Sequence, residues 1–459
     1  MDCQSWCDSS YCGCPCDTLQ CRFGKGVSME IVAVERIPVD AGHVERSGRH
    51  MRRHIADWSI SEICKVITKD GLIGWGETIP HYTWGPVTDE SVERVIGKNP
   101  SDLLWDDSLG AGLQQAMFDL VGKKLGVPAY RLVGPKVRER CPIAWWCWDM
   151  PAEAWVSETR AALDAGYTSF KLKARPWHDL FAATEAISHA TPDHCAFDLD
   201  FNSLLVTTGR AQEVLPRLEA IPKVHFFETP IPQEDVQGNK ALRSKLRLPV
   251  AMHFDNPPFL TAVQEGVCDG WVLNQGAFRT VQQAGLAAEA NMPFWLQLVG
   301  TGITTAFTLH LGASLSHAQW PAITCLNTYA DDLLTHPIEV QRGYSPVPEL
   351  PGLGIEVDED AIERLRRPTT GPHKMPRMIH TVTWADGLRV SYTSHAAMEA
   401  DFLAGNRPGF EPGVSLVTED DDGSEEFDVR WQKVDEADIL VKHGSGMANG
   451  EATQSTKHN

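Results

Sequence analysis

The chain has 459 residues, of which 42% are hydrophobic and 22% are charged, and its formal net charge is −20. This length is too great for one simple core, so the sequence predicts two or three domains of ordinary globular composition. The acidic balance argues against nucleic acid as a partner, because phosphate binding requires a basic surface. No apolar run approaches the roughly 20 residues of a membrane-spanning helix, so we expect no membrane partner.

The cysteines are unevenly distributed, since residues 1–28 hold half of the twelve. This segment could bind zinc, form a disulfide knot, or result from a wrongly assigned translation start. It lacks paired Cys-x-x-Cys units and the apolar run of a signal peptide, so we favour a disordered segment or a wrong start before Met29. The remaining cysteines lie mostly in apolar runs, as in reduced intracellular proteins, and we expect a cytoplasmic location.

Residues 29–135 predict a small domain of strands and helices. A strand comes first, and a hairpin pattern follows with its turn at Asp70-Gly71. A long basic loop, residues 40–58, lies between them. The loop could be a solvated surface or a lid over an anionic substrate, which would make Arg53 and His54 candidate substrate contacts.

Residues 136–335 alternate between apolar strands and amphipathic helices. Eight strands are expected, at Pro142–Trp148, Ser169–Lys173, Cys195–Asp200, Val224–Glu228, Pro249–Phe254, Gly270–Asn274, Pro293–Leu298 and Ala322–Asn327. This pattern is typical of an α/β fold of the (β/α)₈ TIM barrel type. The alternative, an open doubly wound sheet, is disfavoured because no glycine-rich phosphate turn follows the first strand.

Polar residues stand at the carboxyl ends of these strands, where a barrel places its catalytic groups. Lys171 and Lys173 lie two residues apart on one strand and therefore share a face. Two lysines on a core strand are costly unless they face a polar cavity or acidic partners. The ends of the later strands carry Asp200, Asn202, Glu228, His253, Asp255, Asn274 and Gln297.

Residues after the barrel divide into three parts. Residues 336–370 would return to the N-terminal domain. Residues 371–437 predict a β-rich extension, with a hairpin over Met378–Ser394 and one more strand over Glu425–Val434, which could cover a sheet edge, extend the cap or mediate assembly. Residues 438–459 are polar and small, which predicts a disordered tail.

Several short motifs occur in a specific order along the chain. They are Gly74-Trp-Gly-Glu-Thr78, residues 116–128, Lys171-Leu-Lys173, Asp200-Phe-Asn202, Glu228-Thr-Pro230 and residues 351–357. Their order and spacing resemble the enolase superfamily, in its mandelate racemase/muconate-lactonising branch. The resemblance covers about residues 29–367. It implies a modified (β/α)₈ barrel with an α+β capping domain formed by both chain ends, and we also expect a homo-oligomer.

The resemblance implies that a proton is removed α to a substrate carboxylate. Family members hold Mg²⁺ on carboxylates of the third, fourth and fifth strands, and the cation offsets the charge of the enediolate. By match to the family, Lys173 would be the base, because a lysine beside other cations has a lowered pKa. Lys171 would orient it or neutralise the substrate carboxylate. Asp200 and Glu228 would bind the metal, with Asn202 beside it.

The third metal position departs from the family pattern. Direct alignment places Phe254 there, and phenylalanine cannot bind Mg²⁺. Asp255 follows it and His253 precedes it, both with the opposite strand parity, so Asp255 would become the third ligand only if the strand bulges. His253 is otherwise a candidate substrate contact.

The opposing base is also missing, because the sixth and seventh strands end in Asn274 and Gln297. Amides cannot exchange a proton, although they can bind substrate hydroxyl groups. We therefore expect a one-base lyase (dehydratase) or isomerase that acts on an acid sugar or a related small carboxylate. The alternatives are a catalytically impaired, metabolite-binding pseudoenzyme and an assembly protein that uses the C-terminal extension.

Overall fold

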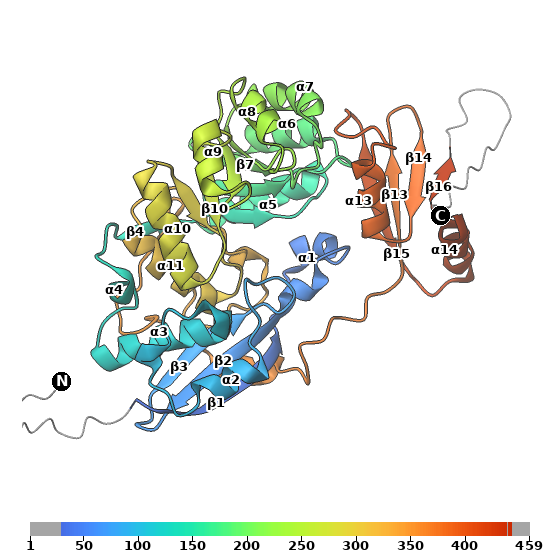
Figure 1. The fold of residues 1–459 in the computed structure, drawn as a ribbon. Coiled ribbons are helices and arrows are strands. Elements are labelled where there is room, and N and C mark those ends of the chain that lie inside the picture. The colour runs from blue at the N-terminus through green and yellow to red at the C-terminus, as the bar shows by residue number, and fades with distance from the viewer. Residues whose placement is uncertain (1–28, 438, 443–459) are drawn as a thin grey trace, which may run out of the picture.

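A computed structural model describes residues 29–437 and 439–442 (Figure 1). The zinc site, disulfide knot or disorder considered for residues 1–28, and the disorder expected after residue 442, concern residues outside this range. Within the range, no helix is long and apolar enough to cross a membrane.

The central domain is a curled parallel sheet with helices outside it, which confirms the expected barrel. Its strands, in the spatial order β11-β10-β9-β8-β7-β6-β5, are β5 (Trp145–Cys147), β6 (Ser169–Lys173), β7 (Ala196–Asp200), β8 (Val224–Glu228), β9 (Val250–His253), β10 (Gly270–Leu273) and β11 (Phe294–Leu296). Its helices are α5 (Ala152–Asp164), α6 (Leu180–Ala190), α7 (Thr208–Glu219), α8 (Val236–Arg243), α9 (Phe259–Glu265), α10 (Ala277–Glu289) and α11 (Gly302–Ser314). The strands are mostly buried, since helices cover the outside of a parallel sheet.

The expected eighth strand is reduced to two isolated parallel bridges. Ala322 pairs with Ile143 beside β5, and Ile323 pairs with Gln297 beyond β11, so these bridges join the two edges of the sheet. A longer strand over residues 322–327 does not form, because Cys325 has a left-handed backbone (φ 58°) and the short helix η4 (Leu326–Thr328) follows.

The capping domain combines an antiparallel sheet, in the order β1-β2-β3, with helices. Its elements are β1 (Ile31–Asp40), α1 (Glu45–Met51), η1 (Ala56–Ser59), β2 (Ile60–Thr68), β3 (Ile73–Thr78), α2 (Asp89–Val95), η2 (Pro100–Asp102), η3 (Asp107–Leu109), α3 (Ala111–Leu125) and α4 (Tyr130–Val133). The expected hairpin forms at Gly71, whose φ of 86° suits glycine. A Cβ atom at Gly76 would lie 1.9 Å from the Gly112 carbonyl oxygen, so glycine lets α3 pack closely on the sheet.

Segments after the barrel return to this cap. β12 (Tyr344–Pro346) pairs with β4 (Arg140–Pro142), which shares only Pro142 with the strand expected at 142–148; the rest of that expected strand forms only over β5. After α12 (Glu359–Leu365), Arg366 forms an antiparallel bridge with Val39 of β1. Both ends of the family-like region therefore build the cap.

The C-terminal extension is a four-stranded antiparallel sheet, in the order β15-β13-β14-β16, with two helices. Its elements are β13 (Met378–Thr383), β14 (Arg389–Tyr392), α13 (His395–Leu403), β15 (Ser415–Asp420), α14 (Glu425–Ala437) and β16 (Leu440–Lys442). The expected hairpin is confirmed as β13–β14. The strand expected over 425–434 is wrong, because Phe427, Trp431 and Val434 follow helical spacing and form one side of α14.

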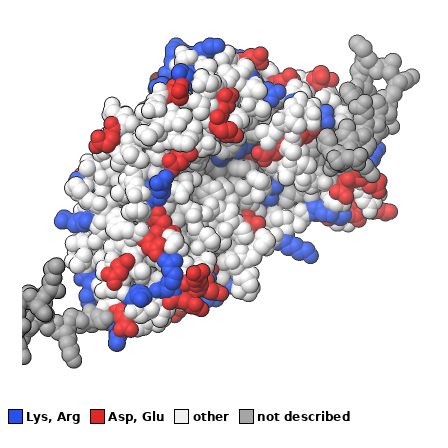
Figure 2. All heavy atoms as spheres, in the orientation of Figure 1, with Lys and Arg blue, Asp and Glu red and all other residues white. Residues whose placement is uncertain are grey.

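Two further differences concern the end of the extension and the molecular surface. Residues 440–442, expected in the disordered tail, form β16 and pair with β14. Figure 2 shows acidic and basic side chains interspersed on the visible face rather than gathered into a basic patch.

Candidate active site

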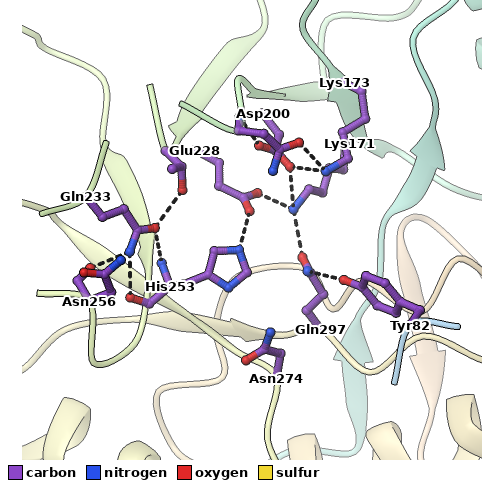
Figure 3. Close-up of polar contacts among 12 residues, drawn as sticks. Tyr82, Lys171, Lys173, Asp200, Glu228, Gln233, His253, Asn256, Asn274 and Gln297 are labelled. Carbon is purple, nitrogen blue, oxygen red and sulfur yellow. Dashed lines mark hydrogen bonds and ion pairs between the residues drawn. The ribbon is translucent and has the colours of Figure 1, made fainter. Parts of the chain in front are cut away.

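The polar network at the barrel mouth begins with the neighbouring strands β6, β7 and β8. In the sheet register, Lys173 of β6 lies opposite Asp200 of β7, which lies opposite Glu228 of β8. The Lys171 ammonium contacts the Glu228 carboxylate and lies 3.4 Å from Asp200 Oδ2 (Figure 3). Lysines and carboxylates that the sequence separates by up to 57 residues therefore form one ion-pair network.

Lys173 occupies the upper edge of this network. Its Nζ atom lies 2.5 Å from Asp200 Oδ2 and donates a 3.0 Å hydrogen bond to Asn202 Oδ1. Arg175, two residues further along the chain, donates to the same Asn202 oxygen at 2.7 Å. Asn202 thus fixes two cationic side chains at one position.

The two lysines differ in how readily they lose a proton. Burial lowers the pKa of the Lys173 ammonium below its ordinary value; Asp200 opposes this shift, whereas Lys171 reinforces it. Burial also acts to lower the pKa of Lys171, but Glu228 and Asp200 outweigh it and raise that pKa above its ordinary value. Of the two lysines, Lys171 is therefore held as a cation, and Lys173 gives up its proton more readily.

Amide and imidazole groups complete the network on the strands beyond β8. Gln297 accepts a 2.8 Å hydrogen bond from Lys171 and donates one of 2.8 Å to the Tyr82 hydroxyl (Figure 3). His253 Nε2 lies 3.4 Å from Glu228 Oε1. Figure 3 shows these side chains pointing into one space above the strand ends.

A cavity of about 390 Å³ opens above the network. Lys173 lines it, whereas Lys171, Asp200 and Glu228 lie beneath its surface. The other lining residues are His54, Ile55, Trp58, Tyr82, Trp146, Trp148, Arg175, Asn202, His253, Asn274, Gln297, Val299, Ile323, Cys325, His395 and Glu399. The size and the mixture of aromatic and polar walls suit one small ligand.

The two candidates from the basic segment have different environments. His54 lines the cavity and stacks on His395, with ring centroids 4.4 Å apart. Arg53 does not line it, because its guanidinium donates 2.8 Å hydrogen bonds to the carboxylate and the carbonyl oxygen of buried Asp149. Arg53 therefore supports the wall of the cavity rather than facing a ligand. The segment around them is not a simple loop, since it contains α1 and η1.

Known proteins share this architecture. A family model described as "Enolase C-terminal domain-like" matches residues 154–361. A D-galactonate dehydratase of Variovorax paradoxus (strain S110) is 25% identical over 351 residues, which cover 66% of this chain and 90% of that relative. The crystal structure of a mandelate racemase/muconate lactonizing family protein from Azoarcus sp. EbN1 is 25% identical, with a TM-score of 0.59, over 74% of this chain and 98% of that one. Residues 154–361 therefore belong to the enolase superfamily, and the chain as a whole is similar to members of its mandelate racemase/muconate-lactonising branch.

Other relatives from the superfamily carry different activities. A muconate cycloisomerase 1-1 of Acinetobacter lwoffii is 25% identical over 343 residues, which are 66% of this chain and 88% of that relative. Dehydratases and cycloisomerases are thus about equally similar to this chain, so sequence identity alone does not distinguish between the two activities.

The superfamily position of the third metal ligand is altered in this chain. Phe254 stacks on Phe259 and packs against Trp271, with ring centroids 5.1 and 5.0 Å away. Asp255 has a φ of 69°, so the backbone does depart from regular strand geometry, but its carboxylate pairs with Arg279 and with Gln283 at 3.3 Å. The bend that would bring Asp255 to the network therefore turns it toward α10 instead.

The remaining residues do not fit a three-carboxylate magnesium site. Among the described residues, no group of three or more His, Cys, Asp or Glu side chains is placed to hold a metal ion. Asp200 and Glu228 supply two carboxylates, and both are already neutralised by lysines. Glu228 Oε1 is buried without a hydrogen-bond donor in the described structure, yet one free oxygen does not make a magnesium site. No reaction step is therefore assigned to a metal.

Several lining residues were not found from the sequence. Arg175 has the same strand parity as Lys171 and Lys173, so that alternation was an available signal. Tyr82 and Trp58 come from the cap, and their rings lie 4.1 Å apart. Residues from α13 lie beyond the family pattern and far from the barrel in sequence, so no local signal places them at the cavity.

Proposed function

We propose that this protein removes the α-proton of a small carboxylate with Lys173 as its single base, as a lyase or isomerase of its superfamily. The observation that supports this most is the position of Lys173, which lines the cavity, is held by Asp200 and Asn202, and has a lowered pKa. A buried lysine whose pKa is lowered holds more of the neutral amine that a general base requires.

An acid sugar is the proposed substrate, and syn β-elimination of water is the proposed reaction. The Lys173 amine first takes the α-proton, reversibly, and the C–H electron pair is delocalised into the carboxylate. That pair then forms the new double bond as the β-hydroxyl group leaves. The same ammonium then returns its proton to that hydroxyl, so one water is released. Arg175 lines the cavity beside Lys173, and a guanidinium suits recognition of the substrate carboxylate. The D-galactonate and D-gluconate dehydratases among the relatives support this class of substrate.

The side of the cavity opposite Lys173 carries amides rather than a second base, which favours a reaction with one base. Asn274 and Gln297 face the cavity where a second base would stand, and amides do not exchange protons at neutral pH. The α-proton should therefore be removed only from the face of the substrate that Lys173 contacts. A homo-oligomeric state and a cytoplasmic location stay predictions.

Binding of a metabolite without turnover is the second candidate function. Two observations favour it. Lysines form ion pairs with Asp200 and Glu228, the two expected metal ligands, and the Asp255 carboxylate pairs with Arg279 instead of joining them. In that case the cavity would bind a carboxylate, and no proton would leave it.

Deuterium exchange distinguishes the two functions. The protein is incubated in D₂O with a panel of acid sugars, and α-deuterium is followed by NMR. We expect exchange with at least one acid, and a loss of about 10²-fold or more in Lys173→Ala and in Lys173→Arg, which keeps the charge but cannot act as a base. Lys240→Ala, on the exposed side of α8, is the control.

Two results would contradict the proposal. Exchange that survives in both Lys173 variants would remove Lys173 as the base. Acids that raise the thermal unfolding midpoint of the wild type but show no exchange would support the second function instead.

A further inference from the structure

The C-terminal extension supplies one wall of the candidate active site. His395 and Glu399, one turn apart on α13, line the same cavity as Lys173. Figure 1 shows the extension beside the barrel, with α13 on the side that faces it. The site is therefore built from three parts of the chain: the barrel, the cap and the extension.

The extension is attached to the loop that follows β6. The Phe410 amide donates to the Pro176 carbonyl oxygen at 3.1 Å, and the Gly413 amide donates to Asp179 Oδ2 at 2.7 Å. The Trp177 ring packs edge-on against Phe402, with centroids 5.6 Å apart. These contacts follow β6 directly, so the strand that carries Lys173 also positions α13.

His395 is the strongest sign of a ligand on this wall. Its side chain is buried, with 4% of the residue exposed, yet both ring nitrogens lack a hydrogen-bond partner within the described structure. An imidazole that is buried without partners is costly unless something else satisfies it. Because His395 lines the cavity, a ligand hydroxyl group can serve as that partner.

Glu399 provides a charged acceptor beside it. Its carboxylate lies 3.8 Å from His395 Nδ1 and keeps about a third of its side-chain surface exposed. A carboxylate accepts hydrogen bonds from hydroxyl groups and repels a substrate carboxylate. The wall thus suits the hydroxylated end of an acid sugar, while the Arg175 guanidinium suits its carboxylate end.

We propose that His395 and Glu399 bind the distal hydroxyl groups of the substrate, so that the extension selects acids by chain length. This inference rests on the proposed substrate class. The extension lies after the family match, which ends at residue 361, and the Azoarcus structure covers 74% of this chain. About a quarter of the chain therefore lacks a counterpart in that structure, and the selection belongs to this chain's own added segment.

A series of aldonic acids with four, five and six carbons tests the inference. KM and kcat are measured for the wild type, Glu399→Gln and His395→Phe, with Glu426→Gln on the exposed face of α14 as the control. We expect each wall variant to raise KM for the six-carbon acid about tenfold or more, the value of one hydrogen bond to a charged or buried group. KM for the four-carbon acid and kcat should change less than about threefold, because neither change touches Lys173.

Binding calorimetry with the same acids separates this inference from the proposed reaction. If no acid is turned over, a loss of affinity confined to the longer acids still supports the wall, while the reaction fails. An equal loss for all chain lengths, or no loss in either variant, would overturn the inference even if exchange by Lys173 is intact. Unchanged thermal unfolding midpoints show that the variants are folded.

Discussion

Removal of the Lys171 charge is the most direct test of the ion-pair network. The Lys171 side chain is buried, and its ammonium contacts Glu228, donates a 2.8 Å hydrogen bond to Gln297 and lies 5.2 Å from the centre of the Trp295 ring. The substitution Lys171→Met keeps most of the length and the apolar stem but removes the cation. Two buried carboxylates then share the single charge of Lys173.

The expected loss of stability in Lys171→Met follows from the burial of both carboxylates that Lys171 contacts. Glu228 and Asp200 side chains are fully buried, so the unpaired carboxylate cannot be solvated by water. Removal of one partner of a buried ion pair costs about 3–5 kcal/mol, because the other charge remains without compensation. Protonation can neutralise that charge, so the loss should be largest near pH 8 and should shrink toward pH 5.

Urea unfolding followed by tryptophan fluorescence at pH 8 and pH 5 measures the effect. Lys240→Met is the matched control, because Lys240 forms a 2.9 Å ion pair with Glu265 on the surface and should lose less than about 1 kcal/mol. The double variant Lys171→Met/Glu228→Gln should recover most of the stability, since no charge is then left unpaired. A loss at pH 8 no larger than that of the Lys240 control would refute the reasoning.

Two further predictions concern metal removal and acid. EDTA should change neither α-proton exchange nor the thermal unfolding midpoint, because lysines already neutralise Asp200 and Glu228; an EDTA-induced loss that Mg²⁺ restores would contradict this. Burial lowers the pKa of His380 to about 4 and of His395 to about 3, below the value of about 6.5 in the unfolded chain, so the unfolded state binds more protons between these values. The contribution of the two neutral histidines to the free energy of unfolding is complete above about pH 6.5. It falls as the pH decreases, by about 2 kcal/mol for each histidine at pH 5. A thermal unfolding midpoint of the wild type that stays constant from pH 8 to pH 5 would exclude this contribution.

Short-range patterns were enough to predict the barrel and the centre of the site. The apolar runs of the parallel strands are long and uniform, because each strand is covered by helices. The polar residues that interrupt them lie at strand ends, which meet at one edge of the sheet. Lys171, Lys173, Asp200 and Glu228 could therefore be placed together from the sequence alone.

The features that the sequence patterns missed depend on contacts between residues that are far apart in the sequence. Asp255 lies next to the expected ligand position, but Arg279, 24 residues later, draws its carboxylate away. Glu399 reaches the cavity through packing of the extension on Trp177, a contact that no local periodicity encodes. The strand expected where α14 forms is a different kind of error. In a short segment, a few apolar residues are compatible with a strand or with one face of a helix. Only the spacing of all the apolar residues in the segment distinguishes the two.

The shared packing between barrel and extension has a consequence for biosynthesis. Phe402, Phe410 and Val414 belong to the same hydrophobic core as Trp177 and the barrel strands. A chain that leaves the ribosome from its N-terminus exposes this side of the barrel until residue 414 has emerged, more than two hundred residues after Trp177. The barrel of this protein can therefore complete its folding only after residue 414 has been made, and an mRNA cut short after the family-like region would yield a product with an unfinished, aggregation-prone wall.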